Sequence, residues 1–140
     1  SLRNQNRVLG IDRDTGDVAW SLDGDDLDDS FRGQHAPLLE DGLVTLFDNL
    51  GQETSRVGPW DRASGELVWS HSLDATHGTF GSAERMTSGD LLVTAVGQRE
   101  DTPGQVQQVT ADGDVVWSLE GFQGHWIYRG RPLEDHVTVE

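Results

Sequence analysis

Residues 56–73 read "RVGPWDRASGELVWSHSL", and the same pattern occurs twice more in the chain. Residues 7–24 read "RVLGIDRDTGDVAWSLDG", and residues 106–121 read "VQQVTADGDVVWSLEG". In each copy a strand-like run leads into a Gly-containing turn, and a second run follows that ends in Trp-Ser. An internal repeat of this kind sets the architecture of the whole chain. The tryptophans of the three copies are 49 and 48 residues apart: Trp20, Trp69 and Trp117.

A second unit alternates with the tryptophan repeat. Residues 35–49, "HAPLLEDGLVTLFDN", match residues 82–96, "SAERMTSGDLLVTAV", and residues 127–140 begin the pattern again. Each period therefore holds four short runs rich in Val, Leu and Thr, joined by turns that contain glycine, as in successive hairpins. Four strands per repeat of this length predict an all-β fold, a β-propeller of four-stranded antiparallel blades. The tryptophan of each repeat is expected to cover the apolar face between two blades.

The repeat also predicts where the blades begin and end. The chain holds about three blades' worth of sequence, whereas propellers close with about 4–8 blades, so residues 1–140 are expected to form a partial propeller within a larger ring. Its partner is then the rest of the propeller, or a second copy in a dimer whose two arcs close a six-bladed ring. The expected boundaries are the end of one blade at 7–22, full blades at 35–73 and 80–119, and the start of another at 125–140.

Composition excludes several classes of partner. The net charge is −15, and all ten basic residues are arginine. A field this negative argues against nucleic acids as partners, because phosphate backbones require basic patches. No stretch is long and apolar enough to be a membrane segment. Cysteine is absent, which excludes disulfides and thiolate chemistry. The excess of Asp and the lack of Lys resemble halophilic proteins, whose acidic surfaces are screened by salt.

Three histidines recur at the place where the innermost strand of a blade begins. In a propeller this strand lines the central channel, so the histidines are predicted to face one axis: His35, His77 and His125. Arg32, Arg85, Arg129 and Arg131 lie close to them in the sequence. Arginine suits the oxygens of sulfate, phosphate or carboxylate, and a neutral imidazole can act as a nucleophile or carry a proton. The pattern predicts an oxyanion site at one mouth of the channel.

Other motifs favour plain structure. His71 and His136 do not share this phase and are interpreted as surface residues. Residues 12–17, "DRDTGD", lack the closing Glu of a calcium loop, and their counterpart "DRASGE" loses one of the three carboxylates, so a hairpin turn is predicted. The acidic run 23–30 is interpreted as a solvated loop between blades. No metal site and no cofactor are expected.

The order of these segments resembles the arylsulfotransferase family. The resemblance rests on residues 1–20, on "GQHAPLLEDGLVTLFDN" at 33–49, and on "GSAERMTSGDLLVTAV", "VTADGDVVW" and "YRGRP" further along. It implies a six-bladed propeller that transfers a sulfuryl group from an aryl sulfate to a phenol, without a nucleotide sulfate donor. It also implies a channel histidine that is transiently sulfated, and a location outside the cytoplasm or at the cell surface.

The resemblance assigns roles to individual residues. The Gln-His pair maps onto Gln34 and His35, which would bind sulfate, and Phe-Asp-Asn maps onto 47–49 and so includes Asn49. The Ser-Arg that follows maps onto Ser55 and Arg56. No motif of the family fixes the nucleophile, and His77 or His125 are candidates from the channel phase alone. Together, the predicted catalytic residues are His35, His77 and His125, and the predicted substrate-binding residues are Gln34, Asn49, Arg56, Arg129 and Arg131.

Two other functions stay open. Ala36 stands where relatives often carry Asp, and no arginine lies between Asn49 and Arg56. These departures favour a non-catalytic β-propeller that serves as a binding or scaffold module. A quinoprotein-like propeller is the third possibility, because such propellers carry similar tryptophan repeats.

Overall fold

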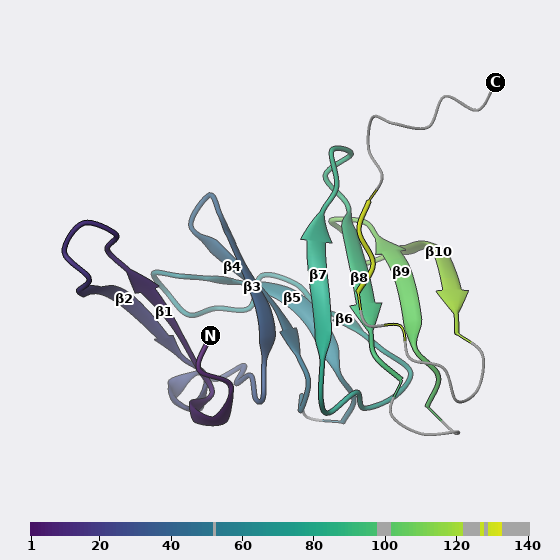
Figure 1. The fold of residues 1–140 in the computed structure, drawn as a ribbon, viewed down its shortest axis with the longest axis horizontal. Helices are drawn as coiled ribbons and strands as arrows, with labels where there is room; N and C mark the ends of the chain where they lie inside the picture. Colours follow the sequence, from purple (N-terminus) through teal and green to yellow (C-terminus); the bar gives the residue numbers. More distant parts are fainter. Residues whose placement is uncertain (52, 98–101, 122–126, 128, 133–140) are drawn as a thin grey trace.

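The computed structural model describes residues 1–51, 53–97, 102–121, 127 and 129–132. These residues form short β-strands joined by turns, and no α-helix occurs among them (Figure 1). Two single 3₁₀ turns are present, η1 (Arg3–Gln5) and η2 (Gly24–Asp26). The strands are β1 (Arg7–Ile11), β2 (Val18–Asp23), β3 (His35–Glu40), β4 (Leu43–Asp48), β5 (Arg56–Asp61), β6 (His71–Ser72), β7 (Gly81–Arg85), β8 (Leu91–Ala95), β9 (Gln105–Val109) and β10 (Val115–Glu120).

The strands form three antiparallel sheets that follow one another along the chain. Strands β1 and β2 pair with each other, β3 to β6 form a four-stranded sheet in sequence order, and β7 to β10 form another. The three sheets stand side by side, and the hairpins β1–β2, β3–β4 and β7–β8 all point to the same end of the molecule (Figure 1). The predicted all-β fold of four-stranded antiparallel sheets is confirmed.

Local turn chemistry explains the hairpins. Asp41 and Gly42 join β3 to β4 with φ angles of 48° and 82°, the left-handed pair that a two-residue hairpin with the right strand twist requires. In the β1–β2 turn, Asp12 Oδ1 accepts hydrogen bonds from the amides of Asp14 and Thr15. Asp61 Oδ1 accepts the equivalent pair after β5. Both aspartates therefore close hairpins, as the sequence predicts.

Each pair of neighbouring sheets encloses its own apolar core. The core between β1–β2 and the β3–β6 sheet consists of Val8, Leu22, Phe31, Val44, Leu46 and Trp60, with Trp20, Leu27 and Leu67 against it. The core between the two four-stranded sheets consists of Phe47, Val57, Leu73, Ala83, Leu91, Val93, Ala95 and Val109, with Trp69 against it. Trp20 and Trp69 thus cover inter-sheet cores, whereas Trp117 on β10 is 43% exposed.

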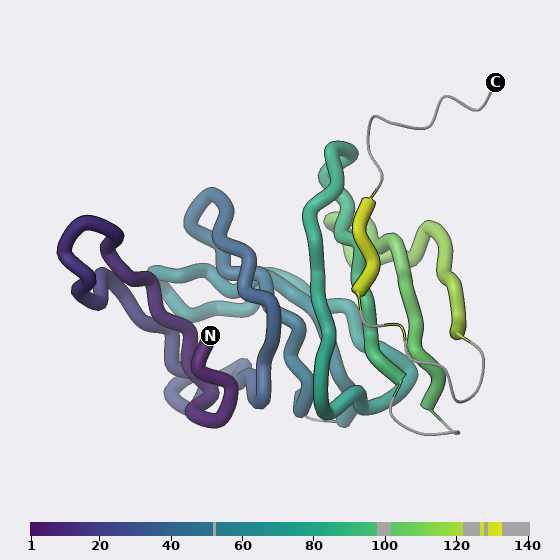
Figure 2. Tube along the Cα trace, viewed as in Figure 1, coloured from purple at the N-terminus to yellow at the C-terminus, as the bar shows by residue number. Residues whose placement is uncertain are grey.

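Strand β8 is buried on both of its faces. The β3–β6 sheet covers one face, and residues 129–132 lie along the other, where the Gly130 amide donates to Thr94 Oγ1 at 2.8 Å (Figure 2). A Cβ on Gly130 would come within 3.4 Å of Thr94, Val106 and Leu92, so this close approach requires glycine. The segment that carries Arg129 is thereby held against the second full sheet.

A repeated ion pair links β3 to β7, and β7 to the segment that carries Arg129. Arg85 on β7 donates through Nε to Glu40 on β3 at 2.9 Å. Arg129 donates in the same way to Glu84 on β7 at 2.6 Å. In both pairs the two residues are 45 positions apart in the chain. The innermost strands thus lie next to one another, and the candidate site lies where they begin.

Candidate functional site

A hollow of about 270 Å³ lies between the beginnings of β3 and β7. Its lining residues come from three segments that are distant in sequence: His35, Ala36, Phe80, Gly81, Ser82 and Arg129. The predicted site residues His35 and Arg129 are therefore brought together. Gly81 allows the two sheets to meet here, because a Cβ at this position would lie 2.5 Å from Cγ of the buried Phe47.

His35 faces this hollow because β3 is irregular at its start. His35 pairs with Phe47, but the register shifts before Leu38, and Ala36 takes a φ of 48°. A bulge of this kind re-aims the neighbouring side chain. The ring of His35 stacks at a tilt of 59° on Phe80, with the ring centres 5.5 Å apart. His35 is half-buried, so part of its imidazole is accessible from the hollow.

Asn49 lies behind His35 and is fully buried. Its Oδ1 is 2.6 Å from His35 Nδ1. Its Nδ2 donates to the carbonyl of His77 at 2.5 Å and to that of Phe80 at 3.3 Å. Asn49 was predicted to bind substrate, and in the structure it does not line the hollow and is held by these protein contacts.

His77 is fully buried and is not among the residues that line the hollow. Its Nδ1 is 2.9 Å from the carbonyl of Val96, and its amide donates to Ser55 Oγ at 2.7 Å. Ser55 Oγ in turn donates to the carbonyl of Asn49 at 2.8 Å. His77 Nε2 is buried without a hydrogen-bond partner. The imidazole predicted to share the channel phase of His35 is thus part of the packed interior.

Gln34 points to the opposite side of the chain from His35. It is fully buried, and its Nε2 donates to the carbonyl of Arg7 at 3.0 Å and to Ser1 Oγ at 3.1 Å. These bonds tie β3 to the β1–β2 hairpin. Gln34 Oε1 is buried without a partner. Alternation along an extended strand places adjacent residues on opposite faces, so Gln34 and His35 do not share a site.

Arg56 belongs to a different part of the molecule. Its Nε donates to Asp48 Oδ2 at 2.9 Å, its Nη2 donates to the carbonyl of Ser30 at 2.7 Å, and its guanidinium lies over the Trp60 ring at 5.4 Å. Burial raises the pKa of the Asp48 carboxyl above its usual value, against the effect of the Arg32 amide and of Arg56, which lower it. The Arg56 hollow is lined by Asp29, Glu53, Thr54, Arg56, Ser70 and Ser72, and His35 is not among them.

The remaining predicted residues do not line the His35 hollow or lie outside the described residues. Arg131 is exposed and does not line the His35 hollow. His125 lies outside the residues that the structure describes. His71, interpreted from sequence as a surface residue, is half-buried, and its Nε2 is 2.9 Å from Gln107 Oε1. This contact joins β6 to β9 across the two full sheets, so His71 also helps to hold the sheets together.

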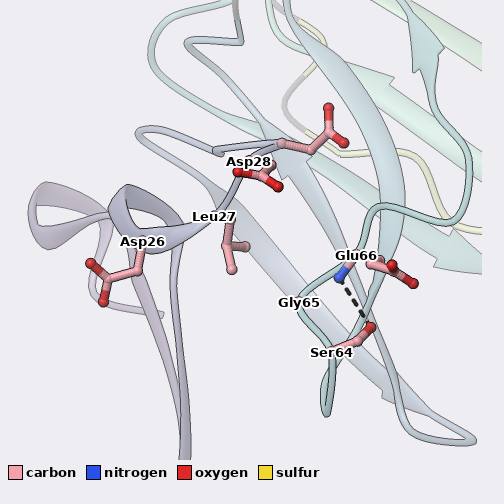
Figure 3. Close-up of a pocket in the computed structure, with 7 residues that line it drawn as sticks. Asp26, Leu27, Asp28, Ser64, Gly65 and Glu66 are labelled. Carbon is pink, nitrogen blue, oxygen red and sulfur yellow. Dashed lines mark hydrogen bonds between the residues drawn. The ribbon is translucent and has the colours of Figure 1, made fainter.

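A second hollow, of about 310 Å³, contrasts with the first in charge. Figure 3 shows it between η2 and the β5–β6 turn, where the Glu66 amide donates to Ser64 Oγ at 3.2 Å. It is lined by Asp26, Leu27, Asp28, Asp29, Ser64, Gly65 and Glu66. None of its described lining residues is basic, and four are acidic, so it would repel anions. Within the described ranges, no group of three or more His, Cys, Asp or Glu side chains is arranged to hold a metal ion.

Ser82 is the site residue that the sequence reasoning missed. It is 6% exposed, lines the hollow of His35, and its Oγ is buried without a partner. The repeat could have indicated Ser82, because the alignment of residues 35–49 with residues 82–96 gives Ser82 the same position in its repeat as His35. A buried hydroxyl without a partner would gain a hydrogen bond from a small ligand or a water molecule that reached it. The hollow lined by His35, Phe80, Ser82 and Arg129 is called the oxyanion hollow, after the site predicted from the sequence.

These features define a partial β-propeller: successive four-stranded antiparallel sheets, cores between neighbouring sheets, and a polar hollow where the innermost strands begin. The family profile described as "Outer membrane protein assembly factor BamB" matches residues 2–124, and the chain belongs to this family. No curated protein matches the chain significantly. The family match supports the propeller predicted from the sequence and does not single out the arylsulfotransferases. Among the described residues, no helix has the length and apolar character to cross a membrane.

Proposed function

We propose that this chain is part of a non-catalytic β-propeller binding module, and that the oxyanion hollow holds a small anion such as sulfate. The observation that carries the proposal is the meeting of His35, Arg129 and the unpartnered hydroxyl of Ser82 at one hollow. These groups supply donors and a cation within an otherwise strongly acidic protein. Guanidinium groups suit tetrahedral oxyanions, and the negative surface elsewhere disfavours competing sites.

The arrangement supports binding better than turnover. Sulfuryl transfer, like phosphoryl transfer, needs several cationic donors around the equatorial oxygens and an in-line nucleophile. His77 is buried, and Arg56 is bound to Asp48 in a different hollow. Among the described residues, Arg129 is the one arginine that lines the oxyanion hollow, and it is paired with Glu84, which offsets part of its charge.

Sulfuryl transfer from an aryl sulfate to a phenol is the second candidate, and the exposed edge of His35 favours it. His35 would attack the sulfur atom, the bond between sulfur and the aryl oxygen would break, and the phenolate would leave. A second phenol would then attack the sulfated imidazole, lose its proton, and restore His35. Phe80, whose ring lies 5.5 Å from that of His35, offers a face for the aryl group.

The family adds a macromolecular aspect to the proposal. Its description names an assembly factor of outer membrane proteins, which favours protein partners and a location outside the cytoplasm. We propose the blade boundaries 7–22, 35–73, 80–119 and 125–140, within a six-bladed ring that further blades or a second copy complete. A quinone-dependent activity would reveal itself as a cofactor absorbance in the purified protein.

Titration with sodium sulfate tests the binding function. We expect backbone amide shifts at residues 81 and 82 and a dissociation constant in the millimolar range, because Arg129 is already paired with Glu84 and exposed ion pairs contribute about 0–1 kcal/mol. Arg129→Gln should weaken binding severalfold. Arg131→Gln is the matched control, since this neighbouring arginine lies outside the hollow. Equal effects of both variants would refute the assignment.

A parallel assay separates the two candidates. The protein is incubated with p-nitrophenyl sulfate and phenol in concentrated sodium chloride, and nitrophenol release is followed by absorbance. The binding module predicts sulfate binding without release. Release by the wild type that is lost in His35→Ala would establish the transferase instead.

A further inference from the structure

The orientation of the Asn49 amide is fixed by its partners. Nδ2 is 2.5 Å from the carbonyl oxygen of His77 and 3.3 Å from that of Phe80. A carbonyl oxygen can only accept a hydrogen bond, so the donating NH₂ group must face these two oxygens. The other end of the amide, the acceptor Oδ1, therefore faces His35. Because Asn49 is fully buried, water cannot replace these partners.

The proton of His35 follows from this orientation. Oδ1 of Asn49 carries no proton, and it is 2.6 Å from His35 Nδ1. The contact is a hydrogen bond only if Nδ1 bears the proton. A neutral imidazole carries one proton, so the other nitrogen, Nε2, is left with its lone pair.

We infer that Asn49 is a positioning residue that holds neutral His35 as the Nδ1–H tautomer, and that oxyanion binding in the hollow is coupled to the uptake of one proton at Nε2. A lone pair repels an oxyanion, whereas a protonated Nε2 donates to it. The second half of this inference rests on the proposed anion-binding function. In its neutral form, Nε2 instead accepts from a ligand hydroxyl, such as that of a phenol.

The described charged groups around His35 do not supply the positive charge that a proton on Nε2 would add. Described charged and titratable groups on the segments around it are Arg129, which is paired with Glu84, Asp48 at the end of β4, the buried His77, and Arg3, whose Nη2 donates to the carbonyl of Gly78. The carboxylates of Glu84 and Asp48 are each occupied by an arginine. The new proton therefore sits on Nε2 itself and is stabilised by the bound anion.

The tautomer can be read from the wild-type protein alone. Long-range ¹H–¹⁵N correlation spectra distinguish the protonated from the bare ring nitrogen, here at a pH above the range of about 5–8 in which histidines titrate. We expect Nδ1 of His35 to be protonated and Nε2 to be bare. A protonated Nε2 would overturn the inference. Asn49→Ala should remove the preference of neutral His35 for the Nδ1–H tautomer. If this variant fails to fold, the wild-type spectrum alone still tests the inference.

Calorimetry of sulfate binding tests the coupling. The binding enthalpy is measured in two buffers with different heats of ionisation. The two enthalpies should differ by up to the full difference between these heats, which corresponds to the uptake of up to one proton per sulfate. The affinity should fall by up to about tenfold per pH unit once His35 is neutral. His35→Gln, whose side-chain amide donates without titrating, should bind with no proton uptake and a flat pH profile.

The two failures are distinguishable. Sulfate binding without proton uptake in the wild type would overturn the coupling and leave the binding function standing. If sulfate does not bind at all, the binding function and the coupling both fail, and the spectrum alone decides the role of Asn49.

Discussion

Gly81→Ala is a sharp test of how the two full sheets meet. Gly81 is the first residue of β7 and pairs with Ala95. A Cβ there would lie 2.5 Å from Cγ of Phe47 and closer still to Cδ1 and Cε1. Phe47 is fully buried in the core between the sheets, so its ring has no free space to move into. Overpacking of this kind costs about 1–3 kcal/mol of unfolding free energy.

Thermal and chemical unfolding, followed by circular dichroism, measure this cost. For a chain of this length we expect the melting temperature of Gly81→Ala to fall by about 3–10 °C. Phe47→Leu removes the ring atoms that the new methyl group would meet, so the double variant should lose less stability than the two single changes combined, with a coupling of about 0.5–3 kcal/mol. Ser82→Ala is the control, because it removes an unpartnered hydroxyl on the other face of β7 and should change stability by about 0.5 kcal/mol or less.

A clear negative result would refute the packing. If Gly81→Ala unfolds within about 0.5 kcal/mol of the wild type, the ring of Phe47 does not lie against β7. Strict additivity in the double variant would lead to the same conclusion, because residues that do not touch do not couple.

Three further outcomes are expected. Glu84→Gln frees Arg129 from its ion pair and should tighten sulfate binding about two- to fivefold in a titration, whereas Glu40→Gln, which breaks the equivalent pair away from the hollow, should leave binding unchanged. Burial raises the pKa of the Asp48 carboxyl, so the folded protein holds the carboxyl proton more tightly than the unfolded chain does. The stability advantage of the wild type over Asp48→Asn should therefore be largest below pH 3.8 and should decline as the pH rises through the pKa of Asp48 in the folded protein. Urea unfolding across a pH series measures this difference. With a net charge of −15, the melting temperature should rise as sodium chloride is raised from about 0.1 M to about 1 M, since the screening length shortens from about 10 Å to about 3 Å; an unchanged melting temperature would show that self-repulsion is unimportant.

The strands and turns were predictable because their causes are local. Asp41-Gly42 supplies the left-handed pair for one hairpin, and the carboxylates of Asp12 and Asp61 close two others. The role of the repeated tryptophan also followed from the repeat for Trp20 and Trp69. Burial of an individual copy did not follow, because Trp117 has the same local sequence pattern but no described sheet packs over β10.

The site was predictable only in part. His35 is the first residue of β3, and the repeat predicted a histidine at the start of this strand. The irregularity that turns its side chain to the hollow, with Ala36 at a φ of 48°, could not be read from the repeat. His77 lies in the loop before β7, where side chains do not alternate regularly as they do in a strand. Its burial, with its carbonyl bound to the Asn49 side chain, could therefore not be predicted from the spacing of the histidines. Arg56 lies on the third strand of its sheet, away from the innermost strand, and there it meets Asp48.

The most direct test of the account is a sulfate titration of the isotope-labelled chain, followed by amide and arginine side-chain resonances. Convergence of the innermost strands around one anion predicts saturable shifts at His35, Gly81, Ser82 and the guanidinium of Arg129, with Arg56 unmoved. Shifts centred on Arg56, or small unsaturable shifts spread over all arginines, would contradict it.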